Sequence, residues 1–199
     1  MQERFARGIQ PITKALHKHK RFLHSARDEN GFAPRGPSAA AHACKAHTFE
    51  SCPDKEVISF LQSQANARYV TAVCTGSTVL AAAGLLDGFH AATHWAYVPI
   101  LEALGIKAVL QRVVTDRNRI TAGGVTAGID FGLTLLAQLR GDDVARRRQL
   151  SIEYDPQPPF NAGHPRTAEP RITKEVSEWL KPYLDDAKSM VQRVSENKT

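Results

Sequence analysis

The stretch from Arg68 to Leu86, RYVTAVCTGSTVLAAAGLL, joins a β-branched run to an alanine- and leucine-rich run with almost no linker. The first run predicts a buried strand and the second a helix. So abrupt a turn pushes its apex residue, Cys74, into an unfavourable backbone region and out toward solvent, and the small Gly76 makes the turn feasible. A helix N-terminus there stabilises the nucleophilic thiolate. The pattern predicts a nucleophile elbow, and the alternative is an ordinary buried cysteine.

Strand and helix patterns alternate along the rest of the chain. In the first helix, Val57, Phe60 and Leu61 fall on one face, and Asp54 can cap it. Alternation of this kind predicts an α/β fold built on a mainly parallel sheet. In chain order, the expected elements are a helix from Asp54, a strand at 68–74, a helix at 76–86, a short strand at 89–93, a helix at 96–105, a hairpin of strands 107–116 and 119–123 that turns at Arg117-Asn118, helices at 125–141 and 142–154, a proline-rich loop at 155–170, and a final helix around 176–190 that Pro182 interrupts or kinks.

His94 is a second candidate for a functional site. It lies twenty residues after Cys74, where the next predicted strand ends. Open α/β sheets bind ligands at the carboxyl ends of their strands, and parallel neighbouring strands would bring both side chains to the same edge. Because His94 is followed by Trp95, a histidine satisfied within the core is the alternative interpretation.

The net charge of +6 belongs to the first part of the chain. Residues 1–47 contain nine Lys or Arg and three Asp or Glu, whereas residues 48–199 contain seventeen of each. The first part also shows no sustained hydrophobic period, which predicts a basic, poorly ordered leader. Charge runs of this kind are usually solvated surface, so we do not expect nucleic acid to be a partner.

The cysteine content and the lack of a long apolar segment bear on the compartment. The chain has three cysteines and no run of the length that a bilayer requires. We therefore expect a cytoplasmic protein that does not enter the membrane. Basic residues near the N-terminus give a faint resemblance to a mitochondrial presequence, which the acidic residues among them oppose.

Three separate blocks of the sequence resemble one family. They are AVCTGSTVLAAAGLLDGFHAATHW, RVVTDRNRITAGGVTAGIDFGLTLL and QLSIEYDPQPPFNAGHP. In this order they resemble the ThiJ/PfpI superfamily, whose fold is like that of class I glutamine amidotransferases, and within it the isonitrile hydratase branch. The resemblance implies a flavodoxin-like three-layer sandwich. It divides the chain into the leader 1–47, a partial ThiJ/PfpI-like domain at 48–165 and a helical extension at 166–199.

The resemblance also implies a thiol enzyme with no cofactor or metal ion, which acts on a small molecule as a homodimer. Cys74 would attack the carbon of an isonitrile, and hydration would give an N-substituted formamide. Thr75 matches a threonine that positions water or substrate. Gly123, Gly124 and Thr126 match a block whose first glycine is an alanine here. We expect these glycines to allow close backbone approach and the threonine to cap the next helix.

The first third of the chain departs from the family pattern. It contains neither the opening strand with its acidic turn, whose carboxylate would hydrogen-bond the thiol, nor the PGG-type turn that supplies oxyanion donors, and a strand is missing at Pro53-Asp54. We therefore expect an incomplete sheet with an open edge beside the elbow, and impaired catalysis. The alternative is a non-catalytic dimerisation or regulatory module. Too few residues follow Asn161 for the paired helix-turn-helix unit of AraC-type regulators.

Overall fold

The structure is a computed structural model that describes residues 39–42 and 55–196. All of these residues belong to one compact unit, Ser38–Thr199. The helix cap expected at Asp54 and the missing strand expected at Pro53-Asp54 lie outside the described residues.

Two sheets form the centre of this unit. The larger has the strand order β1-β2-β6-β5, in which the first three strands are parallel and β5 runs antiparallel to β6. The smaller sheet pairs β3 and β4 in parallel. The strands are β1 Ala39–His42, β2 Val70–Val73, β3 His90–Ala91, β4 Lys107–Ala108, β5 Val113–Asp116 and β6 Arg119–Ala122.

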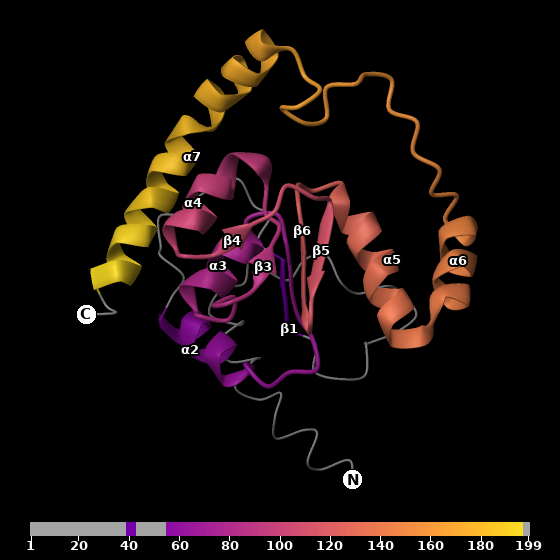
Figure 1. Ribbon diagram of the computed structural model, residues 1–199, viewed down its shortest axis with the longest axis horizontal. Coiled ribbons are helices and arrows are strands. Elements are labelled where there is room, and N and C mark those ends of the chain that lie inside the picture. Colours follow the sequence, from indigo (N-terminus) through magenta and orange to yellow (C-terminus); the bar gives the residue numbers. More distant parts are fainter. Residues whose placement is uncertain (1–38, 43–54, 197–199) are drawn as a thin grey trace. The chain divides into compact units, whose positions relative to one another are not determined.

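Helices cover both faces of the larger sheet, which gives the three-layer α/β sandwich expected from the sequence (Figure 1). On one face, Val70 of β2 packs with Leu80 and Leu101 of the helices on that side. On the other face, Ile120 of β6 packs against Phe131. The helices are α2 Lys55–Ser63, α3 Gly76–Ala82, the short 3₁₀ helix η1 Trp95–Tyr97, α4 Val98–Ala103, α5 Ala127–Arg140, α6 Asp142–Ser151 and α7 Pro170–Glu196.

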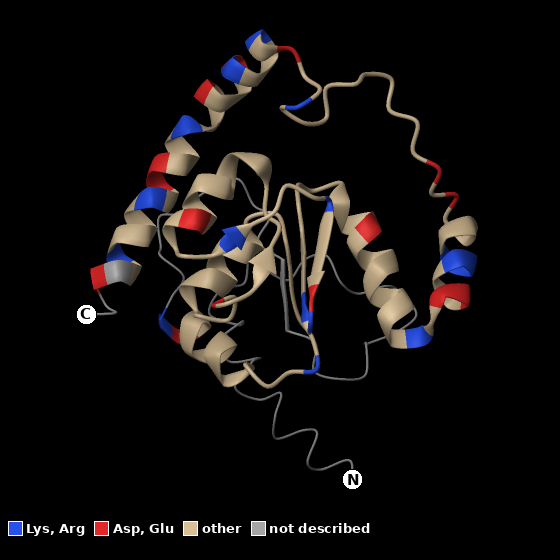
Figure 2. Cartoon of the chain, viewed as in Figure 1, with Lys and Arg blue, Asp and Glu red and all other residues tan. Residues whose placement is uncertain are grey.

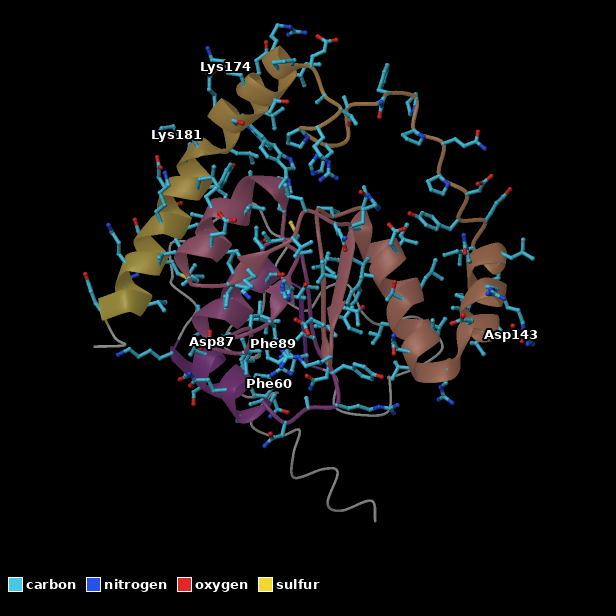
Figure 3. The ribbon with its side chains drawn as sticks, viewed as in Figure 1. Phe60, Asp87, Phe89, Asp143, Lys174 and Lys181 are labelled. Atoms are coloured by element: carbon cyan, nitrogen blue, oxygen red, sulfur yellow. The ribbon has the colours of Figure 1, made fainter. Side chains whose placement is uncertain are left out.

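The last helix, α7, is amphipathic. Its inner face places the fully buried Ala187 and Met190 against η1 and α4. Its outer face is charged, and acidic and basic residues alternate along it in Figure 2. Lys174 and Lys181 extend from this face (Figure 3) and pair with carboxylates one turn further along the helix. The helix is continuous through Pro182, so the expected interruption is wrong.

Most of the local predictions are confirmed. The hairpin, for example, turns at Arg117 as expected, with a φ of +55°. Three predictions need correction. The helix expected at 76–86 ends at Ala82 because the chain reverses through Gly84, where φ is +74°. The single strand expected at 107–116 is divided between β4 and β5, which belong to different sheets. In α2 the residues packed against the core are Leu61 and Ile58, whereas Val57 and Phe60 are exposed.

Strand β1 is the largest difference from the prediction. The sequence analysis placed no strand in residues 1–47, yet Ala39–His42 pairs with β2 in parallel, with Ala39 opposite Val70. Strand β2, which leads into the elbow, is therefore an interior strand, and the edge of the described sheet lies one strand further out than expected, at β1. The sequence AAAH has little intrinsic preference for a strand, because β-branched and aromatic residues supply that preference.

Candidate active site

The backbone at Cys74 is strained in the way that the sequence predicts. Its φ of +59° lies in the left-handed region, which costs a non-glycine residue roughly 1–2 kcal/mol. Neighbouring segments stabilise this conformation. The Cys74 N–H donates to the carbonyl oxygens of Ala122 and Gly123 at 3.0 and 2.8 Å. The Cys74 carbonyl accepts a hydrogen bond from Oγ1 of Thr93 at 3.0 Å. The strand-to-helix elbow is therefore confirmed.

The side chain at the apex is less accessible than expected. Cys74 is 7% exposed, so the prediction that it projects into solvent is wrong. The segment from Thr93 to Tyr97 lies close to this buried residue: the Thr93 hydroxyl bonds the Cys74 carbonyl, and burial of the phenol together with charge on Cys74 raises the pKa of Tyr97. A buried position does not exclude a nucleophile, but the substrate has to reach the thiol through this segment or beside it.

Tyr97 is an electrostatic neighbour of the thiol that the sequence analysis did not identify. Burial of the phenol, together with charge on Cys74, on Asp186 and on Tyr183, raises the pKa of Tyr97 to about 12. The phenol is therefore a neutral hydroxyl at physiological pH. A neutral hydroxyl can donate a hydrogen bond to a developing negative charge near the elbow.

Thr75 and Gly76 form the start of α3. Thr75 has helical backbone angles at the N-cap position, and its side chain makes no cap bond. Its carbonyl accepts from the N–H of Thr78 at 3.0 Å and from the Thr78 hydroxyl at 2.7 Å. Gly76 is buried as the first residue of the helix. Thr75 therefore keeps its hydroxyl out of the helix cap, next to Cys74 in the chain.

The segment that carries His94 is tied to the elbow, but not through the strand pairing that was expected. The neighbours of β2 in the sheet are β1 and β6, and β3 belongs to the smaller sheet. Side-chain hydrogen bonds make the connection instead. Oγ of Ser77 donates to the carbonyl of Ala92 at 2.6 Å, and Thr93 bonds the Cys74 carbonyl. His94 follows directly and is half-buried.

The tautomer of His94 follows from its surroundings. The Ala96 N–H donates to Nδ1 at 3.3 Å, so Nδ1 is the acceptor and the proton of the neutral ring lies on Nε2. Burial lowers the pKa of His94 below its ordinary value. The ring is therefore neutral at physiological pH and presents an Nε2–H donor. A neutral donor of this kind stabilises an anion better than it removes a proton.

The glycine-rich block borders His94. A Cβ at Gly124 would lie 3.3 Å from Cδ2 of His94, closer than most real contacts, whereas a Cβ at Gly123 would meet backbone oxygens at 3.6 Å or more. The close approach of the backbone to the His94 ring therefore favours glycine at Gly124, whereas the space at Gly123 would accept a Cβ. The expected cap by Thr126 is wrong, because its side chain makes no cap bond and its backbone is helical. The first turn of α5 is closed instead by the Ala127 N–H, which donates to the Gly124 carbonyl at 2.8 Å.

A pocket of about 290 Å³ adjoins the elbow. Cys74 is not itself a lining residue, but Thr93 and Gly123 line the pocket and hydrogen-bond the main chain of Cys74. The lining residues are 93–95, 110–112, 123–127, Gly163, His164 and Arg166.

Three charged or titratable lining residues were missed by the sequence analysis: Arg112, His164 and Arg166. His164 lies within the NAGHP end of the third matching block, so a signal existed that was not assigned a role. Arg112 likewise opens the second matching block and lies within the strand expected at 107–116, whereas Arg166 lies in the proline-rich loop expected at 155–170. Nε of Arg112 donates to Oδ2 of Asp130 at 2.8 Å, and the same carboxylate oxygen accepts from the hydroxyl of Tyr154 at 3.1 Å.

Two other kinds of feature are absent from the described residues, 39–42 and 55–196. They contain no cluster of three or more His, Cys, Asp or Glu side chains placed to hold a metal ion. Within the same residues, no helix has both the length and the apolar character that crossing a membrane would require.

Comparison with known proteins agrees with the geometry of the elbow. The model of the DJ-1/PfpI family matches residues 46–138. An isonitrile hydratase from Pseudomonas putida is 45% identical over 167 residues, which are 74% of this chain and 73% of that protein. The HTH-type transcriptional regulator GbdR from Pseudomonas aeruginosa is 42% identical over 94 residues, but these are 26% of its length.

A solved structure supports the same relationship. The crystal structure of a ThiJ/PfpI family protein from Pseudomonas syringae is 42% identical and superposes with a TM-score of 0.68. The match covers 70% of this chain and 58% of that protein, so this chain spans less than two thirds of its length. Taken with the extent of the match to the hydratase, these findings show that the chain belongs to the DJ-1/PfpI family.

Proposed function

We propose that the chain is a cysteine-dependent isonitrile hydratase in which Cys74 is the nucleophile. The observation that carries the proposal is the strained elbow at Cys74, in a chain that is 45% identical to an isonitrile hydratase. A residue held in a costly backbone conformation by three hydrogen bonds is typical of a functional site. The similarity to an isonitrile hydratase suggests the reaction, and the strained backbone suggests Cys74 as the residue that carries it out.

The reaction balances with one thiol and one water. The Cys74 S–H adds across the terminal carbon of R–N≡C, which forms a C–S bond and places the proton on that carbon. Water then adds to the resulting thioformimidate, R–N=CH–S, and one of its protons goes to the nitrogen. Breaking the C–S bond releases R–NH–CHO and returns the second water proton to sulfur. No oxidant, reductant or cofactor is consumed.

Three groups near the elbow have proposed roles in these steps. Thr75 positions the attacking water or the substrate. The Nε2–H of His94 and the neutral hydroxyl of Tyr97 donate to the nitrogen as negative charge develops there. We further propose that turnover is slow, because the sequence lacks the acidic turn and the PGG-type turn that the family likeness implies.

The proposal extends to the context of the reaction. The chain acts on a small molecule as a homodimer in the cytoplasm, without a metal ion or an organic cofactor. The leader expected at 1–47 ends before β1, because Ala39–His42 belongs to the sheet; the family domain extends to residue 165 and 166–199 is a helical extension. Light scattering of the purified protein tests the dimer, and limited proteolysis tests the boundaries, which should be cut before β1 and near residue 165.

A direct assay tests the activity. Purified full-length protein is incubated with tert-butyl isocyanide or benzyl isocyanide, and the formamide proton is followed by NMR. We expect slow product formation that Cys74→Ser abolishes and Cys52→Ser leaves intact, because Cys74 is the residue at the strained elbow. Product formation that survives Cys74→Ser contradicts the proposal.

The alternative is a non-catalytic dimerisation or regulatory module. It is favoured by the likeness to GbdR, which is named as a transcriptional regulator. Such a module would bind a small molecule at the same end of the sheet without turnover. Absence of formamide, together with saturable binding of a ligand that Cys74→Ser does not weaken, would favour this alternative over the hydratase.

A further inference from the structure

The pocket beside the elbow is lined by hydrogen-bond donors. We call it the donor pocket, and define it by the lining residues given above. Two arginines, two histidines and the amide of Gln111 supply side-chain N–H groups. None of the described residues that line it is Asp or Glu. A pocket with donors and no carboxylate suits a ligand that is rich in acceptors.

The histidines present donors rather than acceptors to this space. The backbone N–H of Arg166 donates to Nδ1 of His164 at 3.0 Å, so the proton of the neutral ring lies on Nε2. Burial and the charge of Arg166 both lower the pKa of His164, which keeps the ring neutral. His94 has the same tautomer because Ala96 bonds its Nδ1.

The two arginines differ in their partners. Arg112 is paired with the Asp130 carboxylate, which leaves little net charge at that position. Arg166 has no acidic partner within ion-pair distance among the described residues, and the bond that its side chain makes is from Nη1 to the Leu110 carbonyl at 3.1 Å. That bond fixes one edge of the guanidinium and leaves other N–H groups for a ligand. A planar guanidinium binds a carboxylate with two parallel hydrogen bonds.

An apolar pocket adjoins the donor pocket. It has a volume of about 350 Å³ and shares Trp95, Leu110, His164 and Arg166 with its neighbour. Its remaining walls are Val98, Pro99 and Pro165. An apolar group here would lie beside a charged group held at Arg166, because both pockets meet at that residue. Together the two spaces suit a small molecule with an acidic end and an apolar side chain.

We propose that the ligand of this site is an organic carboxylate with an apolar substituent, bound through Arg166 and His164. Resting on the hydratase function proposed above, this makes the substrate an isonitrile whose substituent carries a carboxylate and an apolar side chain. The product is the corresponding N-formyl amino acid. Arg166 selects the substrate through charge and takes no part in bond making.

A binding experiment tests this inference without requiring turnover. N-formylleucine and N-formylleucinamide differ only in that the first carries a carboxylate and the second an amide. We expect the full-length protein to bind the acid at least tenfold more tightly than the amide in isothermal titration calorimetry. Arg166→Gln should reduce this ratio to below threefold. The control Arg146→Gln should retain the full ratio, because Arg146 is 75% exposed on α6 and pairs with Asp142 outside both pockets.

Equal binding of acid and amide by the wild type overturns the inference, as does an Arg166→Gln variant that keeps the tenfold ratio. Because Arg166 is exposed, its substitution should not unfold the chain, and Arg166→Lys provides a second variant that keeps the charge and loses the fork. We expect Arg166→Lys to bind the acid with an intermediate preference. A preference as large as that of the wild type would contradict the bidentate contact only, because lysine keeps the charge without the fork. The ratio of acid to amide binding in the wild type decides whether a carboxylate is recognised at all.

Turnover separates failure of this inference from failure of the hydratase proposal. The substrate pair is 2-isocyano-4-methylpentanoate and its methyl ester, for which we expect kcat/KM to favour the acid at least tenfold. If neither is hydrated but N-formylleucine binds through Arg166, the hydratase proposal fails and the carboxylate inference stands. If both are hydrated at equal rates, the hydratase proposal stands and the carboxylate inference fails.

Discussion

Substitution of Gly124 by alanine is the most direct way to move His94 without removing it. The new Cβ would lie 3.3 Å from Cδ2 and 4.0 Å from Nε2 of the imidazole. Ordinary carbon–carbon contacts are about 3.5–4.0 Å, so the ring must move by a few tenths of an ångström. Neither Gly123 nor Gly124 has a φ in the left-handed region, so alanine introduces no backbone strain of that kind.

The expected consequence is a loss of function with little loss of stability. Alanine lowers the conformational entropy of the unfolded chain and so adds about 0.4–1 kcal/mol to the free energy of unfolding. This gain offsets part of the cost of the close contact between the new Cβ and the imidazole. The Nε2–H donor, however, is displaced from the elbow, and a misplacement of about 1 Å can cost roughly a hundredfold in rate. For a few tenths of an ångström we expect kcat/KM for isonitrile hydration to fall by about threefold to tenfold.

Gly123→Ala is the matched control. Its Cβ would meet the carbonyl oxygens of Gln111 and Thr93 at 3.6 and 3.7 Å, which are ordinary contacts. The assay compares kcat/KM, the thermal midpoint and the ¹⁵N shifts of the His94 ring in both variants. We expect only Gly124→Ala to change the His94 shifts and the rate. Equal effects of the two variants on the rate, or unchanged His94 shifts in Gly124→Ala, would refute the role given to the imidazole.

Three further predictions concern the thiol and the opposite end of the sheet. Cys74 should show the lowest apparent pKa of the three cysteines when alkylation rates are measured against pH, and faster labelling of either other cysteine in folded protein would contradict the elbow as the reactive position. Hydrogen bonds from the His90 N–H, from a neighbouring arginine and from the His90 ring lower the pKa of Asp116. The Asp116 carboxylate therefore stabilises the fold above the pKa of about 4 that it has in the unfolded chain. This stabilisation is lost progressively as the pH falls from that value toward the lower pKa of the folded state. The difference in urea midpoint between wild type and Asp116→Asn should shrink between pH 6 and pH 3, and a constant difference would refute this. The guanidinium carbons of Arg117 and Arg119 lie 3.6 and 4.6 Å from the centre of the Phe89 ring. Phe89→Leu should therefore lower the free energy of unfolding by about 0.5–2 kcal/mol. The control Phe60→Leu, on the exposed face of α2 (Figure 3), should have a smaller effect.

Features encoded by short local patterns could be predicted from the sequence. The elbow at Cys74 follows from a β-branched run, a small residue and a helix-forming run in direct succession, and the hairpin follows from Arg117-Asn118 between two strands. The three-layer arrangement follows from the alternation of strands and helices. In each case the residues that determine the structure are close together in the chain.

Features that depend on distant contacts could not be predicted in this way. Strand β1 is specified by its backbone pairing with β2, and its alanines carry no signal of their own. The segment after β3 is brought to the elbow by the hydroxyls of Ser77 and Thr93, which look like ordinary polar residues in the sequence. The charge of the donor pocket comes from Arg166, because Arg112 is paired with Asp130, and the segments that carry the two arginines meet only in the folded chain.

Binding and turnover have separate structural origins in this chain. The thiol and its strained backbone come from the turn after β2, and are held by Thr93 and Gly123. The proposed carboxylate-binding groups come from the loop between α6 and α7, where His164 and Arg166 hydrogen-bond each other and the loop after β4. Loss of acid/base groups at the elbow therefore leaves the proposed anion contact intact. A slow hydratase and a competent binder of N-formyl amino acids are compatible in one chain, so affinity for the acid cannot be inferred from the rate of hydration and has to be measured separately.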